Sequence, residues 1–415
     1  MWPLATDKPK HLLPLAGHPI ISYSLRALAA AGIKEVFMVV GFKGEQIASS
    51  LGDGSEYGVT IQYLHQRRWT GTASAIEIAR ESVGNETFLA LYGDLLIDQT
   101  CVNTVLGKAR ECSKVMGVVR LKQEGKSEYG IVELKGDDVA RIREKPIAKR
   151  DSGILINGGI YVLDGDIFRS IKKTSRSARN EYELTTSLQR LIDGGQVVKA
   201  AVVAGEGWMD IGRPWDLLGA NERILSNLEP QLKGTVESGA VVNGPVFLGD
   251  DTVIRSGSYI EGPAYIGEKS AIGPNCRVRP YTSIADEAHV GSFCEVKNSI
   301  VMAHSKVPHL SYVGDSVIGE QCNLAAGTIT ANIRLDEAPI RMRLKGKLTS
   351  SGRRKLGAII GDWVQTGVNT SIMPGVRIGQ NSYIGPGVIV YEDVPANRMV
   401  LARQPLIMKT RKRRL

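Results

Sequence analysis

The stretch Leu248–Val296 reads LGDDTVIRSGSYIEGPAYIGEKSAIGPNCRVRPYTSIADEAHVGSFCEV and carries a branched aliphatic residue at every sixth position. A period of six fits neither an α-helix nor a β-hairpin. It indicates the hexapeptide repeat of a parallel β-helix, in which each short strand turns one aliphatic side chain inward. One coil cannot bury its own core, so stacked coils must stabilise one another. The residues in this register are Leu248, Ile254, Ile260, Ile266, Ile272, Val278, Ile284, Val290 and Val296.

The same register returns towards the C-terminus after an interruption. Between Ile333 and Lys355 the sequence is charged and irregular. An insertion inside a solenoid must loop out of it, and such loops often build binding sites. The stretch Val394–Pro405 leaves the repeat, and we expect it to pack across the last coils. The repeat positions after the interruption are Ile360, Ile372, Ile378, Ile384 and Val390.

The front half of the chain has a different pattern. Short apolar runs at Glu35–Val40, Phe88–Tyr92 and Val115–Val119 indicate buried strands. Amphipathic stretches at Ile20–Ala31 and Ala73–Glu81 lie between them and indicate helices. This alternation predicts an α/β Rossmann-like sheet with helices on both faces.

We therefore expect two domains and a tail. An α/β domain should occupy residues 1–225, a left-handed parallel β-helix residues 226–405, and a basic tail residues 406–415. The segment Arg213–Pro230 should be a helix that joins the domains. A chain of 415 residues is too long for one ordinary core, which agrees with this division.

Composition narrows the class of protein. Hydrophobic residues make up 43% and charged residues 23%, and no apolar stretch is long enough to span a bilayer. Residues Met1–Leu4 lack the layout of a signal peptide. The five cysteines show no metal-binding or disulfide pattern, so we expect reduced thiols in the cytoplasm.

The net charge of +9 is concentrated at the C-terminus, where Lys409 and Arg411–Arg414 supply five positive charges. The mild excess elsewhere suits anionic ligands such as sugar phosphates, nucleotides or coenzyme A. The tail could bind nucleic acid or phosphorylated ligands, but it is also typical of a solvated chain end. We expect neither a nucleic-acid nor a membrane partner.

Two motifs near the N-terminus resemble the sugar-1-phosphate nucleotidyltransferase family. Pro3–Lys10 reads PLATDKPK and Leu12–Pro19 reads LLPLAGHP, which follow the family signature except at Ala5. Later segments agree in order and spacing, so the resemblance covers the whole front domain. It implies that Lys10 contacts a phosphate near the attacked phosphorus.

The same resemblance implies which residues of the front domain bind the base, the metal and the sugar. Gln66, Gly71 and Thr72 should form the turn that recognises a uracil or thymine base. Asp94, in Tyr-Gly-Asp after a strand, and Asp210, in Trp-Met-Asp-Ile-Gly, should hold Mg²⁺, which commonly uses one or two carboxylates and bridges phosphates. The implied sugar-1-phosphate pocket consists of Gly130, Glu144, Lys145 and Asn157.

One departure from the family concerns the phosphate cradle. Family members carry a strand and a Gly-rich L-A-A-G-x-G-T-R loop immediately before the residue that matches Met1, and its backbone N–H groups bind the triphosphate. This sequence contains neither. We therefore expect the front half, as it stands, to transfer nucleotide poorly.

The solenoid carries a second, residue-specific resemblance. Val296–Asp315 reads VKNSIVMAHSKVPHLSYVGD, and Gly327–Asn332 reads GTITAN. These motifs resemble the acetyltransferase half of the bacterial bifunctional glucosamine-1-phosphate acetyltransferase/uridylyltransferase. Archaeal bifunctional sugar-1-phosphate nucleotidyltransferase/acetyltransferases are similar over the whole chain.

Acetyl transfer from a thioester to a sugar amine needs a base, and histidine suits that task near neutral pH. His309 matches the family's base. The resemblance further implies a homotrimer whose acetyl sites are shared between subunits. Val368 and Pro386 replace the Ser and Ala that the family often has in the CoA groove. The implied contacts are Arg279, Lys297, Tyr312, Asn323 and Lys355 for the sugar phosphate, and Ala326, Asn332 and Arg403 for acetyl-CoA.

The leading hypothesis is a bifunctional enzyme. It would acetylate glucosamine-1-phosphate or galactosamine-1-phosphate with acetyl-CoA and transfer a nucleotide from UTP or dTTP to the product. One alternative is an acetyltransferase with an inactive front domain. Another is a non-catalytic regulatory or assembly subunit related to guanylyltransferases, which His309 and the phosphate-binding cations argue against.

Overall fold

The computed structural model describes residues 1–121, 129–144, 153–405 and 408–409. The chain packs as two compact units. One contains Asp7–Pro14 and His18–Gly212, and the other contains Met1–Thr6, Leu15–Gly17 and Arg213–Leu415. The joining helix therefore packs with the solenoid, so the change of unit comes earlier than the boundary expected at residue 226.

The front unit is an α/β domain built on a six-stranded mixed sheet with strand order β5-β10-β7-β11-β9-β8. Strand β11 runs parallel to β7, whereas β10 is antiparallel to both β5 and β7. The strands are β5 (Phe88–Leu91), β7 (Val115–Arg120), β8 (Ile131–Lys135), β9 (Asp138–Arg143), β10 (Leu155–Leu163) and β11 (Lys199–Val203).

Helices cover both faces of this sheet, as the sequence predicts. Met116 and Val118 face a core that includes Leu184 and Leu188 of helix α7. Val115 and Val119, one position away along the strand, pack with residues of α1 and α5. The helices of this unit are α1 (Ile20–Ala30), α2 (Gly44–Leu51), α3 (Thr72–Ile78), α4 (Arg80–Val83), α5 (Gln99–Ala109), α6 (Asp166–Ile171) and α7 (Leu184–Asp193), with 3-10 turns η1 (Lys10–Leu12) and η2 (Ser55–Tyr57).

Smaller sheets complete the front unit. The predicted strand β3 (Glu35–Val40) pairs in parallel with β4 (Thr60–His65), and the two form a separate sheet. Strand β6 (Leu95–Ile97) pairs antiparallel with β12 (Trp208–Asp210). A short hairpin joins β1 (Pro14–Leu15) to β2 (His18–Pro19).

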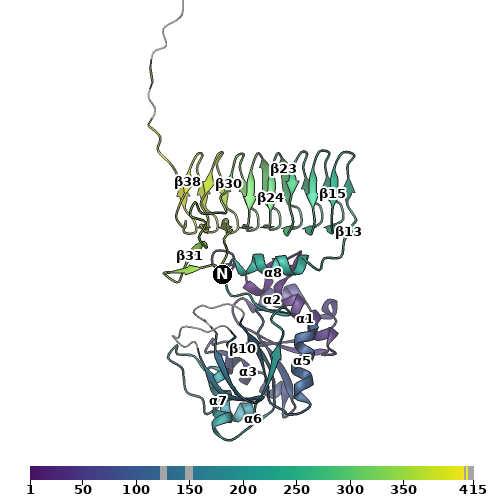
Figure 1. The fold of residues 1–415 in the computed structure, drawn as a ribbon, viewed down its shortest axis with the longest axis vertical. Coiled ribbons are helices and arrows are strands. Elements are labelled where there is room, and N and C mark those ends of the chain that lie inside the picture. Colours follow the sequence, from purple (N-terminus) through teal and green to yellow (C-terminus); the bar gives the residue numbers. More distant parts are fainter. Residues whose placement is uncertain (122–128, 145–152, 406–407, 410–415) are drawn as a thin grey trace, which may run out of the picture. The chain divides into compact units, whose positions relative to one another are not determined.

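The second unit is a prism of three parallel sheets, which we call the first, second and third faces in chain order (Figure 1). The first face contains β13 (Gln231–Leu232), β16 (Val246–Leu248), β19 (Ala264–Ile266), β22 (Thr282–Ile284), β25 (Ile300–Val301), β28 (Val317–Ile318), β33 (Ile359–Ile360) and β36 (Arg377–Ile378). The second contains β14 (Thr235–Val236), β17 (Val253–Ile254), β20 (Ala271–Ile272), β23 (His289–Ser292), β26 (Lys306–His309), β29 (Asn323–Leu324), β34 (Gln365–Thr366), β37 (Tyr383–Ile384) and β39 (Met399–Val400). The third contains β15 (Val241–Asn243), β18 (Tyr259–Glu261), β21 (Arg277–Val278), β24 (Glu295–Lys297), β27 (Tyr312–Gly314), β30 (Ile329–Thr330), β35 (Ser371–Ile372) and β38 (Ile389–Val390).

The predicted repeat register is confirmed. All nine aliphatic positions from Leu248 to Val296 are 0% exposed and belong to one continuous core. Parallel ladders stack them in columns; Ile272, for example, lies between Ile254 and Val290. The fold class expected from the hexapeptide rhythm, a left-handed parallel β-helix after an α/β domain, therefore holds.

The irregular segment loops out of the prism. Strand β30 is the last strand of one coil, and β33, which pairs directly with β28, begins the next, so the residues between β30 and β33 leave the ladders. They include an antiparallel hairpin of β31 (Arg341–Leu344) and β32 (Lys347–Ser350). The C-terminal stretch differs from the expectation, because β39 pairs in parallel with β37 and so extends the second face.

Helix α8 (Asp216–Leu225) packs on the solenoid through a buried amide. The side chain of Asn221 is fully buried; its Nδ2 donates to the carbonyl oxygen of Tyr281 (2.9 Å), and its Oδ1 accepts from Ser283 Oγ (2.6 Å). No helix within the described ranges is long and apolar enough to cross a membrane.

We expect Asn221→Leu to lower the free energy of unfolding of the solenoid unit by about 1–3 kcal/mol, because Ser283 and Tyr281 each lose a buried partner. Asn227→Leu, at an exposed position just beyond the same helix, should change it by less than about 0.5 kcal/mol. Denaturant unfolding measures both variants. Equal stability of the Asn221 variant and the wild type would show that the amide does not fix α8.

Candidate active sites

The front unit brings Lys10 and Asp94 together. Lys10 begins η1, and its Nζ donates to Asp94 Oδ2. Asp210 ends β12 opposite Leu95, and the Ile211 N–H donates to the carbonyl oxygen of Asp94 (3.0 Å). The two aspartates are therefore neighbours across the β6–β12 pair.

Two aspartates on neighbouring strands and a lysine have the donor types that a magnesium–phosphate site uses. Among the described residues no set of three or more His, Cys, Asp or Glu side chains could hold a metal ion. Mg²⁺ does not need such a cage, because it commonly binds through one or two carboxylates together with phosphate oxygens and water.

The turn from Gln66 to Thr72 packs against the segment Tyr182–Leu184. Gln66 Nε2 lies 3.4 Å from the carbonyl oxygen of Gly71, and Thr72 Oγ1 accepts from the Leu184 N–H (3.0 Å). Gly71 has φ +124°, and a Cβ there would lie 2.4 Å from the carbonyl oxygen of Tyr182. This position therefore requires glycine, and the three residues predicted to recognise the base share one turn.

The structure also groups three of the predicted sugar-binding residues; Lys145 lies outside the described residues. The Asn157 N–H donates to the Gly130 carbonyl (2.9 Å), and a Cβ on Gly130 would lie 3.6 Å from Glu144 Oε1. The sequence did not indicate Thr185 and Tyr161, which fix this group. Thr185 Oγ1 donates to Glu144 (2.5 Å), and Tyr161 Oη donates to Asn157 Oδ1 (2.7 Å).

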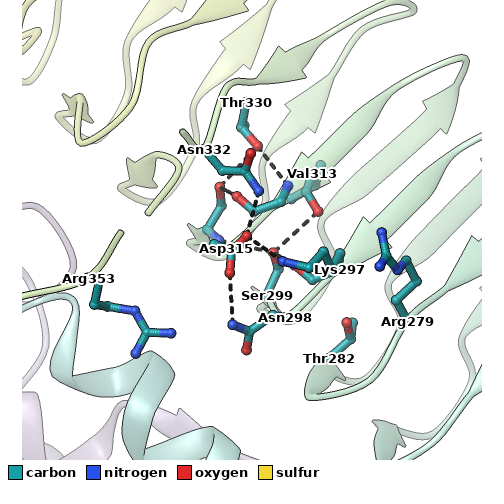
Figure 2. Close-up of polar contacts among 12 residues, drawn as sticks. Arg279, Thr282, Lys297, Asn298, Ser299, Val313, Asp315, Thr330, Asn332 and Arg353 are labelled. Carbon is teal, nitrogen blue, oxygen red and sulfur yellow. Dashed lines mark hydrogen bonds and ion pairs between the residues drawn. The ribbon is translucent and has the colours of Figure 1, made fainter. Parts of the chain in front are cut away.

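In the solenoid, several predicted ligands gather near the edge where the third face ends (Figure 2). Arg279 Nη1 donates to Glu295 Oε1 (2.9 Å), and Lys297 Nζ donates to Asp315 Oδ2 (2.9 Å). Asn332 Nδ2 donates to Tyr312 Oη (3.1 Å) and to Asp315 Oδ2 (2.5 Å). Each of the two cations is thus already paired with a carboxylate.

Tyr312 is held with its hydroxyl proton available. Burial raises the pKa of Tyr312, and the nearby Asp315 carboxylate adds to the rise, so the phenol stays neutral at physiological pH. Because Asn332 donates to the phenolic oxygen, the O–H itself can donate to a ligand. A Cβ on Gly314 would lie 2.5 Å from Tyr312 Oη, so only glycine at this position leaves room for the hydrogen bond between Asn332 and Tyr312.

Other predicted residues lie elsewhere. His309 ends β26 and Asn323 begins β29, so both belong to the second face, and both are exposed. No hydrogen bond within the described part of the chain joins the His309 imidazole to the cluster on the third face. Burial lowers the pKa of His289, with Arg255 and His309 adding to the effect; this second histidine near His309 was not indicated by the sequence.

Within the described ranges, no side-chain hydrogen bond joins the remaining predicted ligands to the cluster. Lys355 closes the insertion through a bridge to Ile333, next to Asn332. Ala326 accepts a backbone hydrogen bond from Asn369 (2.8 Å). Arg403 follows β39 and is exposed, as is Val368 in the expected CoA groove.

Comparison with known proteins decides the family. The profile of the family described as "Nucleotidyl transferase" matches residues 1–227, more than half of the chain. The chain belongs to this family. A second profile, "GMPPB C-terminal domain", matches residues 260–369 within the solenoid.

Relatives extend the likeness to both halves. "Bifunctional protein GlmU" of Methanococcus maripaludis is 40% identical over 100% of this chain and 97% of the relative. "Bifunctional sugar-1-phosphate nucleotidylyltransferase/acetyltransferase" of Sulfurisphaera tokodaii is 39% identical over 94% of each chain. The nucleotidyltransferase is thus one of the bifunctional sugar-1-phosphate nucleotidylyltransferase/acetyltransferases, as the sequence motifs predicted.

A solved structure described as a putative glucose-1-phosphate thymidylyltransferase from Bacillus anthracis is 26% identical. It covers 53% of this chain and 88% of its own, with a TM-score of 0.48.

Proposed function

We propose that the chain acetylates a hexosamine-1-phosphate, glucosamine- or galactosamine-1-phosphate, with acetyl-CoA and then transfers UMP or dTMP to the product from UTP or dTTP. The observation that carries this proposal is the convergence of Lys297 and Asn332 on one buried carboxylate, Asp315, with Tyr312 Oη accepting from the same Asn332. Such an arrangement suits recognition of a phosphorylated, hydroxyl-rich ligand. A solenoid that served only as a scaffold would not need it.

In the acetyl-transfer reaction His309 takes a proton from the sugar amine. The amine nitrogen attacks the thioester carbonyl, so a C–N bond forms, the C–S bond breaks, and coenzyme A leaves as a thiol. Arg279, Lys297 and Lys355 bind the sugar phosphate, and the Tyr312 O–H donates to the same ligand. Asn323 orients the sugar, while Ala326, Asn332 and Arg403 contact acetyl-CoA.

Nucleotidyl transfer uses the front unit. Asp94 and Asp210 would hold Mg²⁺, which would supply positive charge to offset that of the phosphates. Lys10 stabilises the charge that develops on the attacked phosphate. Gln66, Gly71 and Thr72 bind the base, while Gly130, Glu144, Lys145 and Asn157 bind the sugar-1-phosphate.

We also propose a homotrimer with shared acetyl sites. His309 lies on the second face, whereas Lys297 and Tyr312 lie on the third, and a neighbouring copy could bring the two sets together. The five free cysteines agree with a reducing compartment, so we propose that the enzyme works in the cytoplasm.

Two assays test the proposal separately. Thiol release from acetyl-CoA is measured after adding glucosamine-1-phosphate or galactosamine-1-phosphate. Pyrophosphate release is measured from UTP or dTTP with the N-acetylated sugar phosphate. We expect both products, with pyrophosphate released more slowly than thiol, because the front half is expected to transfer nucleotide poorly. Absence of thiol release with either amine would contradict the acetyltransferase assignment.

Asp94→Asn should lower the rate of pyrophosphate release at least about 100-fold. This is the usual cost of losing one group that stabilises the charge of a transition state. Acetyl transfer should stay unchanged, since the substitution lies outside the solenoid unit. Asp137→Asn, at an exposed position of the same unit, is the matched control. Full nucleotidyl transfer by the Asp94 variant would remove this carboxylate from the proposed site.

A further inference from the structure

Asp315 is a buried carboxylate that accepts from three side chains at once. Only 3% of its side chain is exposed. Its Oδ2 accepts from Lys297 Nζ (2.9 Å) and Asn332 Nδ2 (2.5 Å), and its Oδ1 accepts from Asn298 Nδ2 (2.9 Å; Figure 2). The sequence motifs did not indicate it as a site residue.

The backbone holds Asp315 firmly at a prism corner. Its N–H donates to the Lys297 carbonyl (2.9 Å), and its own carbonyl accepts from the Gly357 N–H (2.8 Å). Asp315 has φ +48° and Asn298, on the preceding coil, has φ +44°. Asp and Asn tolerate this left-handed conformation better than most side chains, so stacked corners can carry them.

Helix α8 adds further contacts that hold the residues around Asp315 in place. Asn298 Nδ2 also donates to Glu222 Oε1 (2.9 Å), and the guanidinium of Arg353 donates to the same carboxylate. Arg353 comes from the end of the insertion, and Glu222 lies in α8. Asp315 is therefore fixed both by the solenoid and by the two elements that pack beside it.

The Asp315 carboxylate can fix the positions of the side chains that donate to it. Hydrogen bonds to an ionised carboxylate are stronger than neutral ones, so Asp315 limits the motion of both Lys297 and Asn332. Lys297 has three donors and uses one on Asp315, which leaves two for a phosphate. Misplacement of binding groups by about 1 Å can cost a reaction 100-fold, so a fixed geometry matters.

We propose that Asp315 is a positioning residue that sets Lys297, a phosphate ligand, and Asn332, an acetyl-CoA ligand, at the same time. This inference rests on the proposed acetyl-transfer function. One buried carboxylate would then couple the sugar-phosphate subsite to the acetyl-CoA subsite. This role is distinct from maintaining the prism corner.

The test is Asp315→Asn, which keeps the shape of the side chain and removes its charge. We expect the KM values for the sugar phosphate and for acetyl-CoA both to rise about tenfold or more, because both ligands lose their fixed anchor. Asp251→Asn, an exposed corner Asp with φ +58° on another coil, should leave both KM values unchanged.

A double-mutant cycle distinguishes positioning from simple loss of structure. If Asp315 acts through Lys297, Asp315→Asn should not raise the sugar-phosphate KM further in a Lys297→Ala background, but should still raise the acetyl-CoA KM. In an Asn332→Ala background the pattern should be the reverse. Equal, additive effects in every background would overturn the inference.

If Asp315→Asn does not fold, Asn298→Gly replaces it, because glycine accepts the positive φ and the change removes one donor to Asp315. We expect it to raise both KM values about threefold, less than Asp315→Asn does, because two donors to Asp315 remain and the change matches the net worth of one ordinary hydrogen bond. A folded variant of either kind with wild-type KM values would contradict the positioning role. Lack of acetyl transfer and of calorimetric binding of glucosamine-1-phosphate and coenzyme A by the wild type would instead refute the proposed function.

Discussion

Replacing His309 with alanine should lower acetyl transfer about 10²- to 10⁴-fold, the usual cost of losing a general base. A protonated sugar amine is no nucleophile, and His309 is the exposed imidazole that the family motif places at this step. The substitution removes no inward aliphatic residue, so the solenoid should keep its melting temperature. Thiol release from acetyl-CoA measures the loss.

The matched control is His304→Ala, another exposed histidine of the solenoid, whose Nδ1 lies 3.3 Å from Glu287. It should keep wild-type acetyl transfer. Pyrophosphate release from the N-acetylated sugar phosphate should be normal in both variants. If the His309 variant retains more than half of the acetyl transfer, the base has been assigned to the wrong residue.

The second large effect concerns the core of the solenoid. Ile272→Asp should unfold the solenoid unit, because Ile272 is 0% exposed and the aspartate would have no buried partner. Burying an unpaired charge costs several kcal/mol, which is comparable to the whole stability of an ordinary domain. Neighbouring coils depend on one another, so the damage should spread along the stack.

Circular dichroism during heating measures this effect. Lys269→Asp puts the same charge at an exposed corner of the same coil, at a residue with φ +53°, and should melt like the wild type. An unchanged melting temperature for Ile272→Asp would mean that the repeat register is wrong.

The solenoid could be predicted because its signal is local and repeated. An inward aliphatic at each sixth residue must be buried, and the columns from Leu248 to Val296 are indeed fully buried. The boundaries of the front strands were also close, since β3 begins and ends where its apolar run does. The antiparallel insertion of β10 between β5 and β7 could not be predicted, because alternation of strands and helices does not fix strand order.

The candidate sites were predictable only where a residue belongs to a recognised motif. Lys297, Tyr312 and Asn332 carry such motifs, and the structure joins them. Glu222 lies outside the motifs, and Asp315 ends one of them without an implied role, because the roles of both depend on the stacking of corners and on how α8 packs. Thr185 likewise reaches Glu144 across a separation of 41 residues, which no local pattern reveals.

One measurement tests the central claim, that a single chain acetylates a hexosamine-1-phosphate and then activates it with a nucleotide. The purified protein is incubated with acetyl-CoA, glucosamine-1-phosphate, UTP and Mg²⁺, and the nucleotide sugar is quantified by chromatography and mass spectrometry, with galactosamine-1-phosphate and dTTP as alternative substrates. We predict an N-acetylated nucleotide sugar, with one thiol and one pyrophosphate released for each molecule formed. Thiol release without any nucleotide sugar in all four substrate combinations would contradict the bifunctional account and leave an acetyltransferase alone.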